Sequence, residues 1–405
     1  MNNIEQPSKM EKEIYILMFK NDEVLSFEVT FGEYFRVKII DKLAHYEKAP
    51  LNISKCETDE QRNAKLFKFF YSRTIASTRY DYEDILKATN CRDSFELSFK
   101  GHGLSLANHY WFKKENENLR YEDINFFTNK WDDSFARAVL NGDYEALKNA
   151  DLNVPDIVTP GWAVKGWLCE KDGPTLYKFS ISKNHYEEQL GETLASSLGR
   201  KLLADEVLEY KLIKVNDNYA STSKCMINID EELIPLADIL SKEFDPYLTS
   251  FSGDHEKIKS FLNKLLETGY KDIYQHYVKI LVLKTLVFAN DFHFNNISII
   301  RNINTGKIRM APIYDLGGAF GGSENGRKLL SNVNSGLLFI LLFSYGMLEP
   351  DWDYSWFDSS KLHGFENEIR NTLSKSEFYN QELLDNIIYF YNYQKESLEK
   401  MAKRK

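Results

Sequence analysis

The sequence has few cysteines, no long apolar run and no excess of positive charge. Its four cysteines lie far apart in 405 residues without paired spacing, so neither a zinc knot nor a disulfide framework is expected, and a reducing cytoplasm fits best. They are Cys56, Cys91, Cys169 and Cys225. No apolar run approaches the length of a membrane span, since LLFILLF at 337–343 is too short, and the N-terminus lacks the apolar core of a signal peptide. We therefore expect a soluble chain with no membrane partner.

Several sequence signals of common function classes are also missing. The net charge of −9 gives no global attraction to nucleic acid, and Lys and Arg are scattered, so direct nucleic-acid binding is not expected. There is no Gly-x-Ser-x-Gly elbow, no His-Glu-x-x-His helix, no Walker A loop and no Gly-x-Gly-x-x-Gly loop. His102 and His109 lack a nearby third ligand, so we interpret them as surface or structural histidines rather than metal ligands. Hydrolase functions have little support.

The length and composition indicate a globular protein of two or three domains, because 405 residues with 43% apolar and 14% aromatic content are ample for more than one core. Residues 1–150 are aromatic-rich and predict an α+β accessory domain, with a strand at SFELSFK (94–100) and a short helix at YEDILKAT (82–89). The segment DLNVPDIVTPGW (151–162) has two prolines and suits a connection between units, so we place a boundary near residue 151.

The order of elements differs between residues 151–229 and 230–405. The first range predicts a strand ending near Glu170, a Lys-Asp-Gly turn and a second strand, TLYKFS. A helix, HYEEQLGETLASSLGRKLL, and two more strands follow, which is the outline of a small nucleotide-covering lobe. The second range is mainly helical, with helical periodicity at 255–270, 272–290 and 381–404.

The most informative stretch is NDFHFNNISIIRNINTGKIRMAPIYDLGG, at 290–318. It predicts a hairpin of two strands, ISII and KIRMAPI, around an Asn-Thr-Gly turn. The hairpin should bring Asn296 and Asp315 side by side as oxygen ligands for Mg²⁺, with Asp291 as the base that deprotonates an acceptor hydroxyl in phosphoryl transfer. His293 suits packing and hydrogen bonding, since magnesium prefers oxygen. The ordinary alternative is that these residues cap a helix, sit in a turn and begin a loop.

A lysine that grips phosphates needs a carboxylate to hold its ammonium, and a strand followed by a helix supplies both. Lys178 lies late in the strand TLYKFS, and Glu192 lies on the helix that follows. Glu187 and Glu188 are rival partners, but we place them in the frayed start of the helix and prefer Glu192. The alternative is a solvated lysine beside acidic residues that complement the helix dipole.

Two further segments are candidates for nucleotide contacts. Gly161, Lys165 and Gly166, in TPGWAVKGW, suit a turn that covers phosphates, although a loop of small residues between domains has comparable weight. Cys225 and Met226, in YASTSKCMIN, suit a hinge to which adenine hydrogen-bonds, although residues of a core strand look the same.

From about Gly161 to the end of the hairpin, the sequence resembles the HipA-like bacterial serine/threonine kinases. The pieces that carry the resemblance are GWAVKGWL, LYKF, GETLASSLG, NDFHFNN and APIYDLGG. The resemblance implies an α+β, two-lobed protein-kinase-like fold with a small β-rich lobe, a larger helical lobe and an additional N-terminal α+β domain. It also implies ATP and Mg²⁺ as cofactors, Asp291 as catalytic base, Asn296 and Asp315 as metal ligands, and Lys178 on the nucleotide phosphates. It does not extend to residues 1–150, and Thr159 is the nearest hydroxyl to the serine that some members autophosphorylate.

The expected function is an ATP- and Mg²⁺-dependent serine/threonine kinase that acts on a protein substrate, with an antitoxin or other regulatory protein as a possible partner. Two alternatives stay open. One is a lipid or small-molecule kinase on the same fold, against which the lack of a basic membrane-facing cluster argues mildly. The other is a pseudokinase or scaffold, which has no physical need to retain Lys178 and the three polar residues of the hairpin.

Overall fold

The computed structural model describes residues 11–32, 34–179, 185–215, 218–240, 244, 255–289, 296–330, 348–349 and 352–403. The chain divides into two compact units. The first comprises residues 1–175 and 227–232, and the second comprises residues 176–226 and 233–405. The three-part division expected from the sequence places its boundaries at other residues and stays a prediction.

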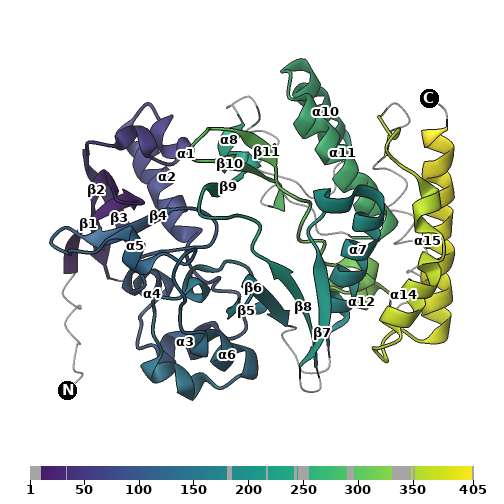
Figure 1. Cartoon of the computed structure of the whole chain (residues 1–405), viewed down its shortest axis with the longest axis horizontal. Helices are drawn as coiled ribbons and strands as arrows, with labels where there is room; N and C mark the ends of the chain where they lie inside the picture. The colour runs from purple at the N-terminus through teal and green to yellow at the C-terminus, as the bar shows by residue number, and fades with distance from the viewer. Residues whose placement is uncertain are drawn as a thin grey trace, which may run out of the picture. The chain divides into compact units, whose positions relative to one another are not determined.

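The first unit contains an antiparallel sheet with strand order β3-β2-β1-β4, joined by short helices (Figure 1). Its elements in chain order are β1 (Glu11–Phe19), β2 (Asp22–Phe31), β3 (Arg36–Lys42), α1 (Leu51–Ser54), α2 (Asp59–Tyr71), α3 (Tyr82–Ala88), α4 (Ser94–Lys100), β4 (Tyr110–Lys114), α5 (Tyr121–Ile124), α6 (Ser134–Asn141) and β5 (Val164–Glu170). The core beneath the sheet is aromatic, with Phe27, Phe70 and Phe112 almost fully buried. The packing of α2 against the strands accounts for the many aromatic residues in this part of the sequence.

One element of the first unit differs from the sequence-based expectation. Residues 94–100, predicted as a strand, form the helix α4, whereas the helix predicted at 82–89 is present as α3. The alternating pattern of SFELSFK fits a strand, but Asp93 caps a helix here, because its side chain accepts a hydrogen bond of 2.8 Å from the N–H of Glu96. The carboxylate of Glu96 in turn accepts from the N–H of Arg92 at 2.9 Å. The aspartate N-cap at Asp93 was the signal that the alternation obscured.

His109 has the structural role expected for it. The side chain is fully buried, one ring nitrogen lies 2.6 Å from the Tyr121 hydroxyl, and the other lies 2.8 Å from the carbonyl oxygen of Glu231. Burial and the charge of Lys20 lower its pKa to about 4, so the ring is neutral at physiological pH. It therefore fastens residues 227–232 to the rest of the first unit.

The second unit combines short strands with a helical half. Its elements are β6 (Gly173–Phe179, from Leu176 onward), α7 (Glu187–Leu203), β7 (Tyr210–Val215), β8 (Asn218–Lys224), β9 (Glu231–Pro235, from Leu233 onward), α8 (Leu236–Ile239), α10 (His255–Glu267), α11 (Lys271–Leu286), β10 (Ser298–Asn302), β11 (Ile308–Met310), α12 (Glu324–Leu330), α14 (Phe365–Leu373) and α15 (Gln381–Ala402). The strands β6, β8 and β7 are neighbours in that order, and β11, β10 and β9 form a second sheet. The helices predicted at 185–203, 255–270, 272–290 and 381–404 correspond to α7, α10, α11 and α15.

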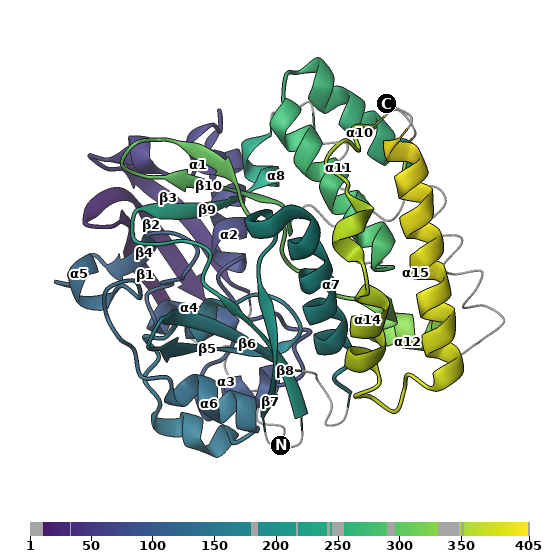
Figure 2. The ribbon, with the colours of Figure 1, turned by 45° about the vertical axis from the view of Figure 1, so that its right-hand side comes forward.

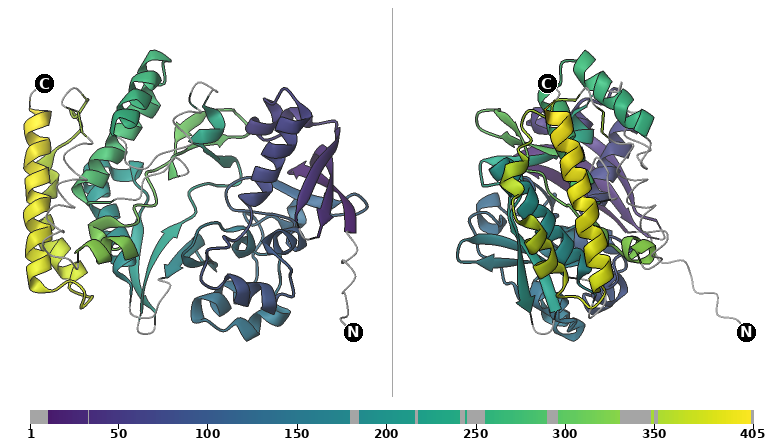
Figure 3. Two further views of the ribbon diagram at one scale, coloured as in Figure 1. Left: turned by 180° about the vertical axis from the view of Figure 1, so that it is seen from behind. Right: turned by 90° about the vertical axis from the view of Figure 1, so that its right-hand side faces the viewer.

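The helices of the second unit share one apolar core. Figure 2 shows α7, α14 and α15 side by side. α11 packs against α7, α15 and α10, and Figure 3 gives two further views of these helices. Leu194, Leu198, Leu283 and Leu398, from α7, α11 and α15, are almost fully buried in this core. Among the described residues, no helix is both long and apolar enough to cross a bilayer. The core fixes α7, and with it the residues that α7 contributes to the site.

Candidate active site

Lys178 joins two carboxylates that come from distant parts of the chain. Its Nζ donates to Glu192 Oε1 at 2.6 Å and to Asp315 Oδ1 at 2.9 Å. The side chains of Lys178 and Glu192 are 14% and 2% exposed, whereas that of Asp315 is 36% exposed. The expected pairing of Lys178 with Glu192 is present. Asp315, which we expected to bind a metal, also accepts a hydrogen bond from the Lys178 ammonium. One carboxylate of the cluster is therefore a buried anchor and the other is accessible from solvent.

Glu192 is held from its other side by a residue that the sequence did not point to. Ser221, on β8, donates its hydroxyl to Glu192 Oε2 at 2.6 Å. Both oxygens of the buried carboxylate are thus hydrogen-bonded, which a carboxylate excluded from water needs. Lys178 also lies over the ring of Tyr210, with its Nζ 5.5 Å from the ring centroid, a cation–π contact. These contacts hold the ammonium in one place.

The charges around Lys178 keep it protonated. Burial alone would lower its pKa, but the carboxylates of Asp315 and Glu192 outweigh burial and raise the pKa well above its usual value. Burial also raises the pKa of Tyr210, so its hydroxyl stays neutral. Lys178 is therefore a fixed cation at physiological pH.

Asp315 adopts a backbone conformation that non-glycine residues rarely use. Its φ is 56°, in the left-handed region, and its N–H donates to the hydroxyl of Tyr210 at 3.3 Å. Such backbones persist only where the surroundings fix them, and they gather at functional sites. The next residues include Gly318, with a φ of 73°. The turn therefore directs the Asp315 side chain toward Lys178 in spite of local strain.

The predicted hairpin exists but is shorter than expected. β10 and β11 are antiparallel, with Ile299 opposite Met310, and β11 ends at Met310 although the strand was predicted to continue to residue 313. The N–H of Ala311 still donates to the carbonyl of Ser298 in β10 at 2.9 Å. Ile313 then pairs with Val207, and its N–H donates to the carbonyl of Glu206 at 2.7 Å. This second partner, remote in sequence, replaces the end of the hairpin.

The two ends of the hairpin are nevertheless linked. Ser298, close after Asn296, shares a hydrogen bond of 2.8 Å with the hydroxyl of Tyr314, the residue before Asp315. Asn296 is half-buried, and no hydrogen-bond partner of its side-chain nitrogen lies among the described residues. Asp291 and His293 lie outside the described residues. The convergence of Asn296 and Asp315 on a metal stays a prediction.

The sequence-based expectation that Glu187 and Glu188 lie in a frayed helix start is wrong, since both belong to the first turn of α7. Glu187 is 2% exposed, and its Oε1 accepts from the Ser376 hydroxyl at 2.6 Å. Glu188 lies near Asp315, since a β-carbon placed on Gly317 would be 3.3 Å from Glu188 Oε1 and 3.8 Å from Asp315 Oδ1. Burial raises the pKa of Glu188 to about 7, with Lys178 opposing the rise. Glu188 is thus a third carboxylate at the site.

The other sequence candidates are Gly161, Lys165, Cys225 and Met226. Gly161 and Lys165 belong to the first unit, where a φ of 102° gives Gly161 a turn that folds back on Lys165. A β-carbon on Gly161 would lie 2.5 Å from Lys165 Nζ, so the ammonium covers this turn. Cys225 and Met226 follow β8 at the end of a segment of the second unit. Their assignment to nucleotide contacts stays a prediction, as does the nucleotide role of Lys178 and Glu192.

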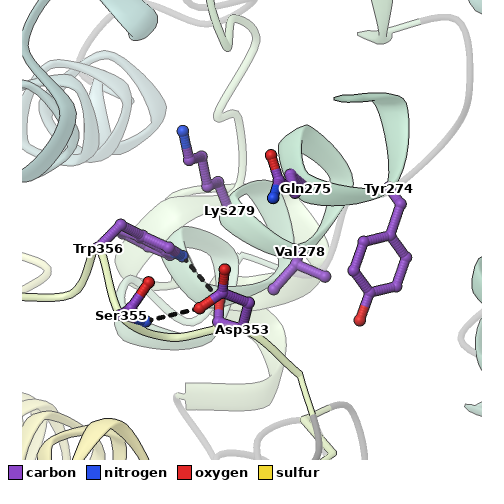
Figure 4. Close-up of a pocket in the computed structure, with 7 residues that line it drawn as sticks. All are labelled: Tyr274, Gln275, Val278, Lys279, Asp353, Ser355 and Trp356. Atoms are coloured by element: carbon purple, nitrogen blue, oxygen red, sulfur yellow. Dashed lines mark hydrogen bonds between the residues drawn. The ribbon is translucent and has the colours of Figure 1, made fainter. Parts of the chain in front are cut away.

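A pocket in the second unit lies between α11 and the residues that precede α14 (Figure 4). Tyr274, Lys279, Asp353 and Trp356 are among its lining residues, and none of the residues around Lys178 contributes to it. Its volume of about 120 Å³ is below the roughly 300–1,000 Å³ of typical small-molecule sites. It is therefore a poorer candidate than the charged cluster.

Comparisons with known proteins bear on the fold. No protein-family model matches the chain, and no curated protein sequence matches it. Among solved structures, HipA in the Shewanella oneidensis MR-1 complex of HipA, HipB and operator DNA aligns with a TM-score of 0.50 and 10% identity over 96% of this chain and 99% of that chain. The Helicobacter pylori proinflammatory kinase CtkA aligns with a TM-score of 0.40 and 16% identity over 59% of this chain and 93% of that chain, a likeness too slight to carry an argument.

The likeness to HipA covers nearly the whole chain, including most of residues 1–150, which the sequence resemblance did not reach. At 10% identity it informs the fold and not the activity. The chain has a mixed α+β, HipA-like kinase fold.

Proposed function

We propose that the protein transfers the γ-phosphoryl group of ATP to a serine or threonine hydroxyl of a protein substrate. The observation that carries the proposal is the contact of Lys178 with both Glu192 and Asp315. These hydrogen bonds bring a strand, a helix and the turn after the hairpin together at one ammonium. Phosphoryl transfer depends mainly on positioned charge, and a lysine held by a helix carboxylate beside a metal-binding aspartate is its recurrent arrangement.

The donor set suits Mg²⁺. Asp315 and Asn296 offer hard oxygens, and the described residues contain no group of three or more His, Cys, Asp or Glu side chains arranged to hold a metal. Mg²⁺ commonly takes one or two protein carboxylates and completes its shell with water and substrate phosphates, so a sparse set fits it better than a closed cage would. When bound there, the ion supplies charge neutralisation to the phosphates.

The residues divide the work as follows. Lys178 binds the phosphates of ATP, Glu192 and Ser221 orient Lys178, and Asp315 and Asn296 hold the cation. Asp291 accepts the proton of the acceptor hydroxyl as its oxygen bonds to the γ-phosphorus; the bond from that phosphorus to the β,γ-bridging oxygen breaks, and ADP leaves. Gly161 and Lys165 would cover the phosphates, and Cys225 and Met226 would contact adenine.

The test is phosphoryl transfer from labelled ATP with MgCl₂, comparing the wild type with Asp315→Ala. Loss of a metal ligand should cost on the order of 4 kcal/mol in the transition state, about a thousandfold in rate. Asp385→Ala is a matched control, because Asp385 pairs at the surface with Arg370. Equal labelling by wild type and Asp315→Ala would contradict the proposal. Running the assay with protein, lipid and metabolite acceptors identifies the acceptor class.

A regulatory protein partner is also proposed, because the HipA of similar fold is seen in a complex with HipB and operator DNA. For this chain the scattered charge favours a protein rather than a direct nucleic-acid contact. A reducing, cytoplasmic location is proposed because no disulfide joins the four cysteines, all of which the structure describes.

A further inference from the structure

The segment that follows Asp315 packs closely along α7, the helix that carries Glu192. We call residues 316–327 the post-Asp315 segment. A β-carbon on Gly191 of α7 would lie 2.3 Å from the carbonyl oxygen of Ala319, and one on Gly322 would lie 2.5 Å from the carbonyl oxygen of Glu187. Only glycine permits two backbones to approach this closely. The position of one element therefore constrains the other.

An ion pair also joins the two elements at the start of α7. Arg327, on α12, lies with Nη1 3.3 Å from Glu187 Oε2, and the same nitrogen donates to the carbonyl oxygen of Gly322 at 2.6 Å. The Arg327 and Glu187 side chains are 20% and 2% exposed, so this pair is largely withdrawn from solvent. Ser376 occupies the other oxygen of the Glu187 carboxylate. Arg327, the last residue of the post-Asp315 segment, thus contacts both the start of α7 and the backbone of Gly322 within its own segment.

The two ion pairs act on α7 from different directions. Glu187 and Glu192 are separated by about 7.5 Å along the helix axis and by about 140° around it. Lys178 joins Glu192 to Asp315, whereas Arg327 joins Glu187 to the far end of the segment that Asp315 begins. Contacts at two heights and two angles fix both the position and the rotation of a helix. The glycines of the segment make such fixing necessary, since glycine has the largest conformational freedom to lose.

We propose that Arg327 is a positioning residue, which acts through Glu187 to hold α7 and the post-Asp315 segment in register so that Glu192 and Asp315 meet at Lys178. The inference deepens the proposed kinase function and rests on it for its catalytic consequence. Its structural consequence, the shielding of the Lys178 ammonium, is independent of any activity.

The first test is acylation of lysines by acetic anhydride, followed by peptide mass spectrometry. The reagent must reach the amine, and the Lys178 side chain is only 14% exposed between its two carboxylates, so a looser site, in which the carboxylates separate from Lys178, should react faster. We expect faster labelling of Lys178 in Arg327→Met than in the wild type, and unchanged labelling of Lys279, which pairs with Glu206. The control Arg370→Met removes a surface arginine that pairs with Asp385 and should leave Lys178 as in the wild type.

The second test is steady-state kinetics of phosphoryl transfer. Misplacing a catalytic group should lower kcat by about tenfold to a hundredfold, with little change in the KM for ATP, because the ammonium itself is retained. Arg327→Lys should recover part of the loss. Because Arg327 acts through Glu187, the double variant Arg327→Met/Glu187→Gln should be no slower than the slower single variant.

The outcomes separate the inference from the proposed function. Wild-type labelling of Lys178 in Arg327→Met, or additive effects in the double variant, would overturn the positioning role. If Arg327→Met does not fold, Glu187→Gln, which removes only the charge of the partner, carries the same expectation for Lys178 labelling. A wild type without phosphoryl transfer overturns the proposed function, while the labelling result still decides whether Arg327 holds the cluster together.

Discussion

Removing Lys178 and Glu192 singly and together measures how strongly the buried pair is coupled. Lys178→Met leaves the Glu192 carboxylate, 2% exposed, with only the hydroxyl of Ser221, and an uncompensated buried charge costs about 3–5 kcal/mol. Glu192→Gln should lower the free energy of unfolding by less, about 2 kcal/mol. Lys178 is partly exposed in this variant and retains its ion pair with Asp315 at 2.9 Å. The double variant strands no buried charge and should cost less than the sum, which gives a coupling of about 3 kcal/mol.

The assay is urea unfolding followed by circular dichroism for the wild type, both single variants and the double variant. A matched control is the more exposed pair Lys395 and Glu366, joined at 2.6 Å, for which we expect a much smaller coupling. Additive costs for Lys178 and Glu192, to within about 0.5 kcal/mol, would refute the reasoning, because additivity is the behaviour of residues that do not interact.

Three further outcomes are expected. Burial raises the pKa of Asp156 from 3.8 to about 7, so between these pH values the folded chain holds a proton that the unfolded chain has lost. The free energy of unfolding should therefore fall as the pH rises, by about 4 kcal/mol over this range. Asp156→Asn should flatten this slope in urea melts from pH 4 to 8, and an unchanged slope would count against it. Gly191→Ala should destabilise by about 1–3 kcal/mol, because its β-carbon meets the Ala319 carbonyl, and an unchanged melting temperature would contradict the close approach. Tyr210→Phe removes the hydroxyl that accepts from the N–H of Asp315 and should cost about 1 kcal/mol in the same melts, with no cost expected if that contact is absent in solution.

Local sequence pattern was sufficient for the long elements. The leucines of α7 and the apolar runs of α11 and α15 repeat at helical spacing over many residues, so their faces could be assigned without knowing what they pack against. It was insufficient for α4, where seven residues alternate as a strand does and only the cap at Asp93 distinguishes the two structures. Short elements give the periodicity too few repeats.

The candidate site was predictable in part for the same reason. Lys178 and Glu192 are fourteen residues apart on adjacent elements, so their pairing follows from a strand-then-helix order. The contact of Lys178 with Asp315 spans 137 residues, and that of Glu187 with Ser376 spans 189. Such contacts depend on tertiary packing, which no local pattern encodes. The hydrogen bond from Ser221 to Glu192 could not be predicted, because a serine in a strand carries no distinguishing signal.

The central claim is that Lys178, Glu192 and Asp315 form the phosphate end of an ATP–Mg²⁺ site, and the most direct measurement is calorimetric titration with ATP in the presence and absence of Mg²⁺. The wild type should bind ATP more tightly with Mg²⁺, and Asp315→Asn, which keeps the shape of the side chain but removes its charge, should lose this dependence. Equal binding with and without the metal, or the same Mg²⁺ dependence in the variant, would contradict the account.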